Sequence, residues 1–338
     1  MDKLALALLV AAGYIMILLV FLLPDIDYDS YFRFQLAYNI GFSVRYAHSL
    51  IWLPVYQFVI AFVRNFLWMR LFSVVCVLLA GVVLARWGLN EDVAVATSVF
   101  FLLNPFILLY GSQAMSESLN VLLTVVFIWL FMREKHVYAA FVLACGVLTA
   151  YSFWVFIPFV LGYVVFERKR ECVAYLLAVF AVVWWGYVNY LFAGKPLNFI
   201  EKASVFYNAL KNRILWGDGW FSFLLFPFIY PFMFVAPFSV KVFSGKLTSM
   251  DVKGKWLLLY FVVAYTVLLV VGQVFGYIFS WGRYFIPLIP VYLLLGCEPV
   301  VKSRRKKVWV MLYFVFSTVM TVFEAVRVYD FKWRMYSD

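Results

Sequence analysis

Charged residues are scarce in this chain. Only 13% of its 338 residues are Asp, Glu, Lys or Arg, whereas 67% are hydrophobic, and the mean hydropathy is +0.95. Because soluble domains are about a quarter charged and about half apolar, this composition excludes an ordinary soluble domain. Several apolar runs approach the roughly 20 residues that a helix needs to cross a bilayer. We therefore expect an integral membrane protein that crosses the bilayer several times.

The patterns of other membrane and secreted classes are also lacking. No segment alternates as a membrane barrel strand does, which leaves helices, since backbone in lipid must satisfy its own hydrogen bonds. The first apolar run, Leu4–Leu23, has only Lys3 before it and no small-residue cleavage site, so we expect it to remain as a helix. The four cysteines show no metal-ligand spacing and lie outside the predicted outer loops, so we expect neither disulfides nor a zinc site.

The apolar runs predict an all-α transmembrane bundle formed by a single domain, residues 1–338. The run ends are uncertain by several residues. Two of the runs are short and are typical of half-depth helices that would meet near Tyr151 and Ser152. The sequence gives about eleven spans: Leu4–Leu23, Leu71–Ala85, Val93–Tyr110, Leu119–Met132, Val137–Ala150, Phe153–Phe166, Val173–Phe192, Phe221–Val240, Trp256–Phe279, Tyr284–Gly296 and Val308–Val326.

The positive charges predict the orientation of these spans. The net charge of +11 indicates cytoplasmic loops and lipid headgroups rather than nucleic acid. Most cations fall on short inner loops if the N-terminus is inside and Ser49–Val63 does not cross. That segment is short and is interrupted by Pro54 and Gln57, so we expect an amphipathic helix along the outer interface. The outer side then carries a first large loop, residues 24–70, and a second, residues 193–220.

The polar candidates for chemistry fall on this outer side. The first outer loop holds Asp27 and Asp29, Glu117 begins the fourth span, and the second loop holds Lys202 and Arg213. Carboxylates beside cations at a membrane surface suit a phosphate-bearing substrate and a hydroxyl that must lose a proton.

The order of these segments resembles the GT-C superfamily of membrane glycosyltransferases, which use polyprenyl-phosphate sugars. The string D-I-D-Y-D-S-Y-F-R-F-Q-L-A resembles the family's acidic motif after the first span, with Asp29 in register with the acid of the oligosaccharyltransferase branch. The string H-S-L-I-W-L-P-V-Y from His48 is similar to the His-Pro-Pro-Leu element of protein mannosyltransferases. The string R-L-F-S-V-V from Arg70 is similar to an Arg-Leu-x-Ser motif. The string containing Glu117 resembles the segment with the second acid, and R-Y-F-I-P-L-I-P from Arg283 also recurs there.

The resemblance implies an enzyme that transfers one hexose, such as mannose, from a dolichyl- or polyprenyl-phosphate donor. The acceptor would be a lipid, a glycan or a protein, and transfer would invert the anomeric centre. The site would lie on the extracytoplasmic face of the endoplasmic reticulum or plasma membrane. Its roles would be Asp29 as base; Asp27 and Glu117 as acceptor ligands; Arg283, Lys202 and Arg213 as phosphate ligands; and Arg70, His48 and Tyr284 as supporting residues.

The chain departs from the family in two ways. We expect no large soluble carboxy-terminal domain in these 338 residues, and W-G-D-G-W at Trp216 lies in the wrong place for a sequon reader. Transfer of a whole oligosaccharide to Asn is therefore not expected. Oligosaccharyl relatives use a metal and the monophosphate relatives mostly do not, so no cofactor is firmly expected, with a divalent cation as the alternative.

Simpler interpretations stand beside these roles. Asp29 could be an N-cap, Asp27 a helix-end charge and Glu117 a helix-start charge. Arg283 could anchor at the headgroups, and His48 could lie at the interface. Two other function classes remain open. A transporter or flippase of lipid-linked sugars would need polar groups at mid-membrane, where the predicted spans hold almost none. A non-catalytic assembly subunit is the third alternative.

Overall fold

The chain folds entirely into helices wherever the structure describes it. The computed structural model describes residues 3–23, 53–87, 90–167, 170–210, 235–236, 238–243, 252–274 and 282–336. These ranges hold fourteen α-helices and no strand. The α-helices are α1 Lys3–Leu22, α4 Pro54–Val63, α5 Phe66–Ala85, α6 Glu91–Leu102, α7 Pro105–Gly111, α8 Ser116–Met132, α9 His136–Val147, α10 Phe156–Glu167, α11 Leu176–Ala193, α12 Asn198–Leu210, α14 Phe238–Phe243, α15 Val252–Val274, α16 Leu288–Val301 and α17 Lys306–Tyr336. Three 3-10 helices join them: η1 Tyr151–Val155, η2 Arg170–Tyr175 and η4 Gly282–Phe285.

Four helices are long and apolar enough to cross a bilayer. They cover Phe66–Ala85, Val173–Ala193, Val252–Gly272 and Lys306–Val326, and the bent pair α6 and α7 would make a fifth. A multi-pass membrane protein is thus supported. Six further apolar helices in the described ranges have only 10–17 residues, less than the roughly 20 that a crossing needs. Eleven spans therefore stay a prediction, and most of Phe221–Val240 lies outside the described residues.

One predicted span, Val93–Tyr110, is broken in the structure. Its two halves, α6 and α7, meet at an angle of 59°. The break has a local cause, because Pro105 cannot donate to the helix and the Asn104 side chain accepts from Phe106 N at 2.9 Å as an N-cap. Asn104 Nδ2 also donates to Tyr313 Oη of α17 at 2.8 Å, which fixes the bend against a distant helix.

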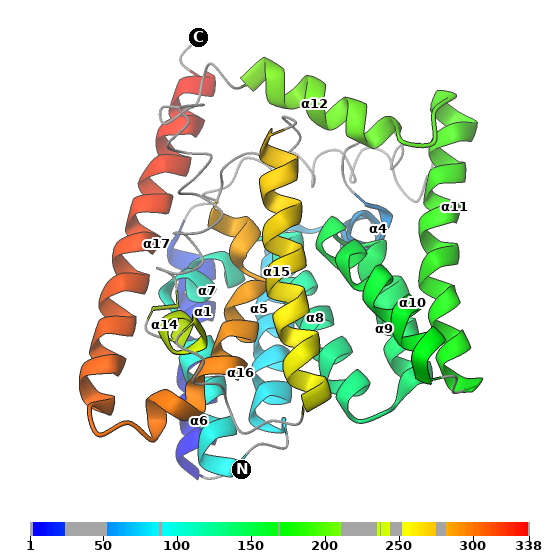
Figure 1. Cartoon of the computed structure of the whole chain (residues 1–338). Coiled ribbons are helices and arrows are strands. Elements are labelled where there is room, and N and C mark those ends of the chain that lie inside the picture. The colour runs from blue at the N-terminus through cyan, green and yellow to red at the C-terminus, as the bar shows by residue number, and fades with distance from the viewer. Residues whose placement is uncertain are drawn as a thin grey trace.

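Helix α4 agrees with the prediction that Ser49–Val63 does not cross. Its 10 residues span only about 15 Å, half of a bilayer core. In Figure 1, α4 is seen nearly end-on, whereas α15 and α17 are seen along their length. The polar residue of α4 faces the protein, because Gln57 is buried, whereas Phe62 is 78% exposed. The free face of α4 is therefore apolar.

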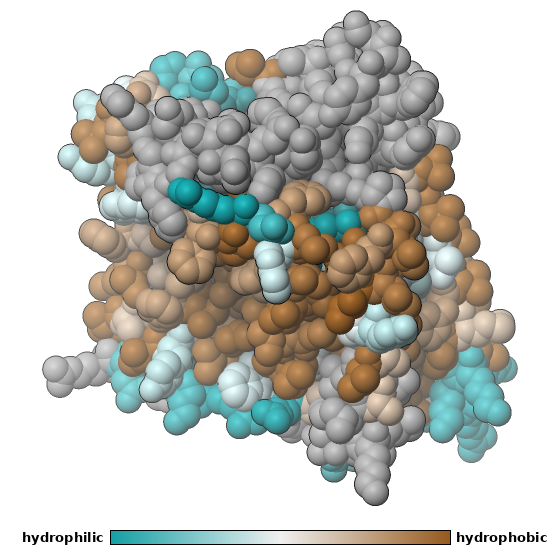
Figure 2. Space-filling model, turned by 180° about the vertical axis from the view of Figure 1, so that it is seen from behind, coloured by the Kyte–Doolittle hydropathy of each residue, from teal (hydrophilic) through white to brown (hydrophobic). Residues whose placement is uncertain are grey.

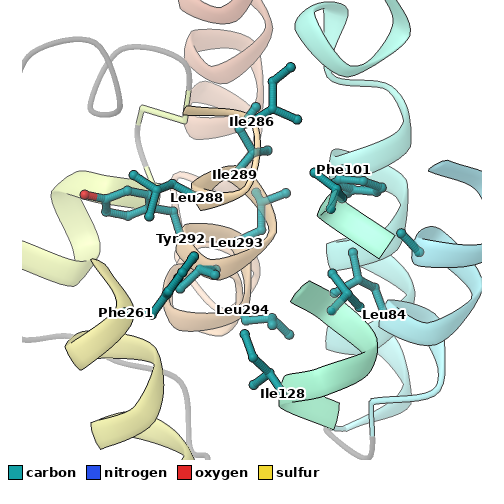
Figure 3. Close-up of a cluster of buried hydrophobic side chains, with 14 of the residues drawn as sticks. Leu84, Phe101, Ile128, Phe261, Ile286, Leu288, Ile289, Tyr292, Leu293 and Leu294 are labelled. Carbon is teal, nitrogen blue, oxygen red and sulfur yellow. The ribbon is translucent and has the colours of Figure 1, made fainter. Parts of the chain in front are cut away.

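Helix α16 lies in the centre of the bundle. Most of its side chains are buried, as expected of a helix that is apolar on all faces. Figure 3 shows Leu293 directed toward Phe101 of α6, while Phe261 of α15 lies on the opposite side of α16. Gly296 permits the closest contact, because an added Cβ would lie 2.6 Å from the backbone oxygen of Phe238 in α14.

The helix ends sort into two faces of the molecule. Following the chain in Figure 1, the turn before α6, the α8–α9 turn and the α16–α17 turn all lie at the end that holds the N-terminus, while α12 lies across the opposite end. These turns carry predicted inner cations, among them Arg86, Arg133 and Lys307. Figure 2 shows a broad hydrophobic band with hydrophilic residues along its lower edge. The sorting agrees with the predicted sidedness, while the identity of the cytoplasmic face stays a prediction.

Candidate functional site

Glu117 begins helix α8 at the end of the molecule opposite the N-terminus. It lies in the first turn of the helix, where the unpaired backbone N–H groups favour a negative charge. Ser116 Oγ donates to Glu117 Oε2 at 3.1 Å. The preceding turn is closed by Met115 N donating to the Gln113 carbonyl at 2.8 Å. Both the helix start and the turn before it thus fix the carboxylate in place.

Arg283 approaches from a segment far away in sequence. It belongs to η4, the short 3-10 helix before α16, and its side chain is 2% exposed. The Tyr265 hydroxyl of α15 donates to the Tyr284 carbonyl at 2.6 Å, which ties η4 to α15. The Arg283 guanidinium carbon lies 5.4 Å from the centroid of the Tyr284 ring, within the range of a cation–π contact.

Glu117 and Arg283 form a buried ion pair. Arg283 Nε lies 3.7 Å from Glu117 Oε1, and the two side chains are 2% and 9% exposed. This separation is too long for a good hydrogen bond but is within ion-pair range. Arginine binds carboxylates and phosphates alike through two parallel N–H donors, so a phosphate-binding role for Arg283 stays a prediction.

A buried polar face on α8 continues from Glu117 toward the interior. Asn120 lies three residues after Glu117, on the same face of the helix, and its Oδ1 accepts from Ser152 Oγ of η1 at 3.0 Å. Thr124 lies one turn further and is fully buried. The site thus joins α8, η1, η4 and α15, and it provides hydroxyl and amide groups beside the ion pair.

Arg70 acts as a tie between helix ends. It is 6% exposed and donates to the carbonyls of Ser112 at 2.8 Å, Leu23 at 3.0 Å and Leu19 at 3.2 Å. A cation is stabilising at the carboxyl end of a helix, and here one guanidinium serves the ends of both α1 and α7. These three bonds are to backbone carbonyls and hold helix ends together, and Ser112 precedes the turn that leads to Glu117.

Lys202 forms no hydrogen bond or ion pair with Glu117 or Arg283 in the part of the chain that the structure describes. It is exposed on α12, the helix that lies across one end of the molecule in Figure 1. The neighbouring Glu201 pairs with Lys195 Nζ at 2.7 Å. The hydrogen bond and charge of Lys195 lower the pKa of the Glu201 carboxyl. A phosphate-binding role for Lys202 stays a prediction.

Four predicted site residues lie outside the described residues. They are the acids Asp27 and Asp29, together with His48 and Arg213. The structure thus brings together Glu117, Arg283 and Tyr284 among the predicted site residues.

Several polar residues of the site were not predicted from the sequence. Asn120 had a readable signal, because it lies three residues after Glu117 in S-E-S-L-N. Ser152 and Tyr265 had no readable signal in the sequence, because each comes to the site only when separate helices pack together. A second missed acid is Glu324, which is fully buried on α17 and lies about five turns from Lys306, toward the end of the span rather than its middle.

A divalent cation would need ligands beyond the described part of the site. Mg²⁺ and Ca²⁺ take several oxygen ligands, often from more than one carboxylate. Within the described ranges, no group of three or more His, Cys, Asp or Glu side chains is arranged to hold a metal. A metal site at Glu117 would therefore require further acids, for which Asp27 stays the predicted candidate.

The arrangement can bind an anion and accept a hydrogen bond or proton in one buried location. Comparisons with known proteins give no family for the chain: no protein-family model matches it, and no curated protein matches it significantly.

Proposed function

We propose that this protein is a membrane glycosyltransferase that takes one hexose from a polyprenyl- or dolichyl-phosphate donor. The single observation that carries the proposal is the buried Glu117–Arg283 pair. The pair holds a carboxylate beside a guanidinium, the group best suited to bind phosphate, in a chain whose described part is all helical and has four helices long and apolar enough to cross a membrane. The acceptor would be a lipid, a glycan or a protein, and the site would face away from the cytoplasm at the plasma membrane or endoplasmic reticulum.

The proposed reaction is a single displacement. The acceptor hydroxyl oxygen attacks the anomeric carbon from the face opposite the phosphate, and Asp29 takes the hydroxyl proton. The bond between the anomeric carbon and the phosphate oxygen breaks, and the lipid phosphate leaves as an anion. Because that anion is already stable, it needs cations more than an acid, and Arg283 supplies the charge. Glu117 then becomes free to hydrogen-bond a sugar or acceptor hydroxyl.

The position of the buried charges favours an enzyme over a flippase. A transporter of lipid-linked sugars would bind its cargo near the bilayer midplane. Here Glu117 lies in the first turn of α8 and Arg283 lies before the first residue of α16, so both are at helix ends. A site at the ends of helices suits a donor whose phosphate lies at the membrane surface and whose tail stays in the bilayer.

Sugar transfer by the purified protein tests the proposal. The reconstituted protein would be incubated with a panel of radiolabelled polyprenyl-phosphate hexoses and a membrane lipid extract, and the products would be separated by chromatography. We expect label from one donor to move to a new product. Intact donors throughout the panel, with a protein that retains its fold, would argue against the proposal.

The proposed base is tested by two matched substitutions. Asp29→Asn preserves size and helix-capping ability but removes proton acceptance, a loss that typically lowers a rate about 10²–10⁴-fold. Asp27→Asn is the control two residues away. Loss of turnover in the Asp27 variant alone would move the base to that position, and normal turnover in both would refute general-base catalysis by this segment.

A further inference from the structure

An apolar pocket opens at the turn between α16 and α17. Its volume is about 490 Å³, and it is lined by Phe100 of α6, Val301 of α16, and Lys306, Lys307, Val310 and Met311 of α17. This volume lies within the range of small-molecule sites. Figure 1 places the turn at the end of the molecule that holds the N-terminus. The pocket is therefore on the face opposite the Glu117–Arg283 pair.

Four consecutive cations lie at the turn between α16 and α17, and two of them, Lys306 and Lys307, line the pocket. Arg304, Arg305, Lys306 and Lys307 are all exposed. No ion pair joins any of them to an acid within the described ranges; Glu298 instead pairs with Lys302. This turn therefore carries a local positive charge that no described carboxylate balances.

Neighbouring residues place the pocket at the level of lipid headgroups. Trp309 is half-buried on α17, and Lys241 Nζ of α14 lies 4.6 Å from the centroid of its ring. Tryptophan and lysine are both enriched at this level of a membrane protein. Beyond the lysines, Met311 and Val315 of α17 are more than half exposed, in a helix long and apolar enough to span a bilayer. The pocket thus begins among cations and leads to a surface suited to acyl chains.

We infer that this pocket binds an anionic phospholipid, with its phosphate on Lys306 and Lys307 and an acyl chain against Phe100, Val310 and Met311. Charge complementarity selects an anionic headgroup, since basic clusters beside a spanning helix recognise anionic lipids. The apolar lining favours a lipid over a free phosphate, because a free phosphate has no acyl chain to bind there. The inference does not rest on the proposed glycosyltransferase activity.

Lipid titration followed by native mass spectrometry tests the inference. The purified protein would be titrated with phosphatidylglycerol and, separately, with phosphatidylcholine. We expect one phosphatidylglycerol to bind more tightly than any phosphatidylcholine. The double variant Lys306→Gln/Lys307→Gln should bind it roughly 30-fold more weakly, because each cation at an anionic lipid surface contributes about 1 kcal/mol. Both lysines are exposed, so the thermal midpoint should hardly change.

Arg133→Gln/Lys135→Gln is the matched control. It removes the same charge from the same end of the molecule, at the exposed α8–α9 turn, and should leave binding unchanged. Val310→Trp, which fills the pocket without changing charge, should weaken binding, and millimolar glycerophosphate should not compete. Equal weakening by both charge variants, or equal binding of the two lipids, would overturn the inference in favour of general electrostatic attraction. Competition by glycerophosphate would overturn the role of the acyl chain.

Discussion

The Glu117–Arg283 pair places two opposite charges where water has little access. Burying such a pair is costly, and removal of one partner leaves the other charge uncompensated, which typically destabilises a protein by about 3–5 kcal/mol. We therefore expect Glu117→Gln and Arg283→Met each to lower stability by roughly that amount. The measurement is chemical denaturation of the purified protein in detergent.

The double variant Glu117→Gln/Arg283→Met measures the coupling between the two side chains separately from the contribution of each. It contains no uncompensated charge, so it should be more stable than either single variant, a non-additivity that defines direct coupling. Lys195→Gln is the control, because both side chains of the Lys195–Glu201 pair are exposed and exposed pairs contribute about 0–1 kcal/mol. Additive losses in the double variant would show that the two residues are not coupled.

At the scale of the elements, Arg70 joins helices through their backbone ends. Arg70→Met removes three charge-assisted donors from the carbonyls of Leu19, Leu23 and Ser112. We expect a loss of roughly 3 kcal/mol, since buried acceptors would be left unsatisfied. Arg64→Met is the control, because Arg64 is exposed and its side chain donates locally, to the Ala61 carbonyl three residues earlier. Similar losses of unfolding free energy in both variants would contradict the claim that Arg70 stabilises the ends of α1 and α7.

The contact between α14 and α16 depends on a glycine. A Cβ at Gly296 would lie 2.6 Å from the Phe238 backbone oxygen, which cannot rotate away as a side chain can. Gly296→Ala should therefore destabilise the protein by about 1–3 kcal/mol through overpacking. At Gly162 of α10, an added Cβ meets nothing within 4 Å, so Gly162→Ala should gain up to about 1 kcal/mol of helix stability. Thermal unfolding of the two variants compares them, and a stable Gly296 variant would disprove the close contact.

The helices themselves were largely readable from sequence, whereas their packing was not. Ten of the predicted apolar runs correspond to described helices, because long apolar runs in a membrane protein have few alternatives. The Asn104–Pro105 pair gives the break after α6 a local signal, but the bond from Asn104 to Tyr313 of α17 and the close approach of α16 to α14 depend on packing. Such packing joins residues that are far apart in the chain, and no local pattern encodes it. The inward side chain of Gln57 was missed for the same reason.

At the scale of the whole molecule, the turns that carry the predicted inner cations and helix α12 lie at opposite ends (Figure 1). We expect Lys135→Cys and Lys195→Cys, placed in a chain without its native cysteines, to be labelled by an impermeant maleimide from opposite sides of the membrane. Both lysines are exposed, one before α9 and the other between α11 and α12. Labelling of both from one side would contradict the orientation drawn from the charges.

The sequence predicted which residues could form the site more readily than it predicted how they meet. Glu117 and Arg283 were predicted from their positions at span ends and Tyr284 from the family resemblance, and the structure joins Glu117 to Arg283 across about half of the chain length. Ser152 and Tyr265 escaped prediction because hydroxyls in aromatic segments carry no signal of their own. The contribution of Asp27 and Asp29 stays a prediction from the first outer loop.

Turnover of the double variant Glu117→Gln/Arg283→Met tests the central claim most directly. The account predicts a folded protein whose transfer of sugar from a polyprenyl-phosphate donor falls by about 100-fold or more, because phosphate loses its guanidinium and the acceptor loses a carboxylate. Initial rates in proteoliposomes, with the fold checked by thermal unfolding, provide the measurement. Transfer at the rate of the unmodified protein would show that the buried pair only holds helices together, and the claim that it forms the catalytic centre would be wrong.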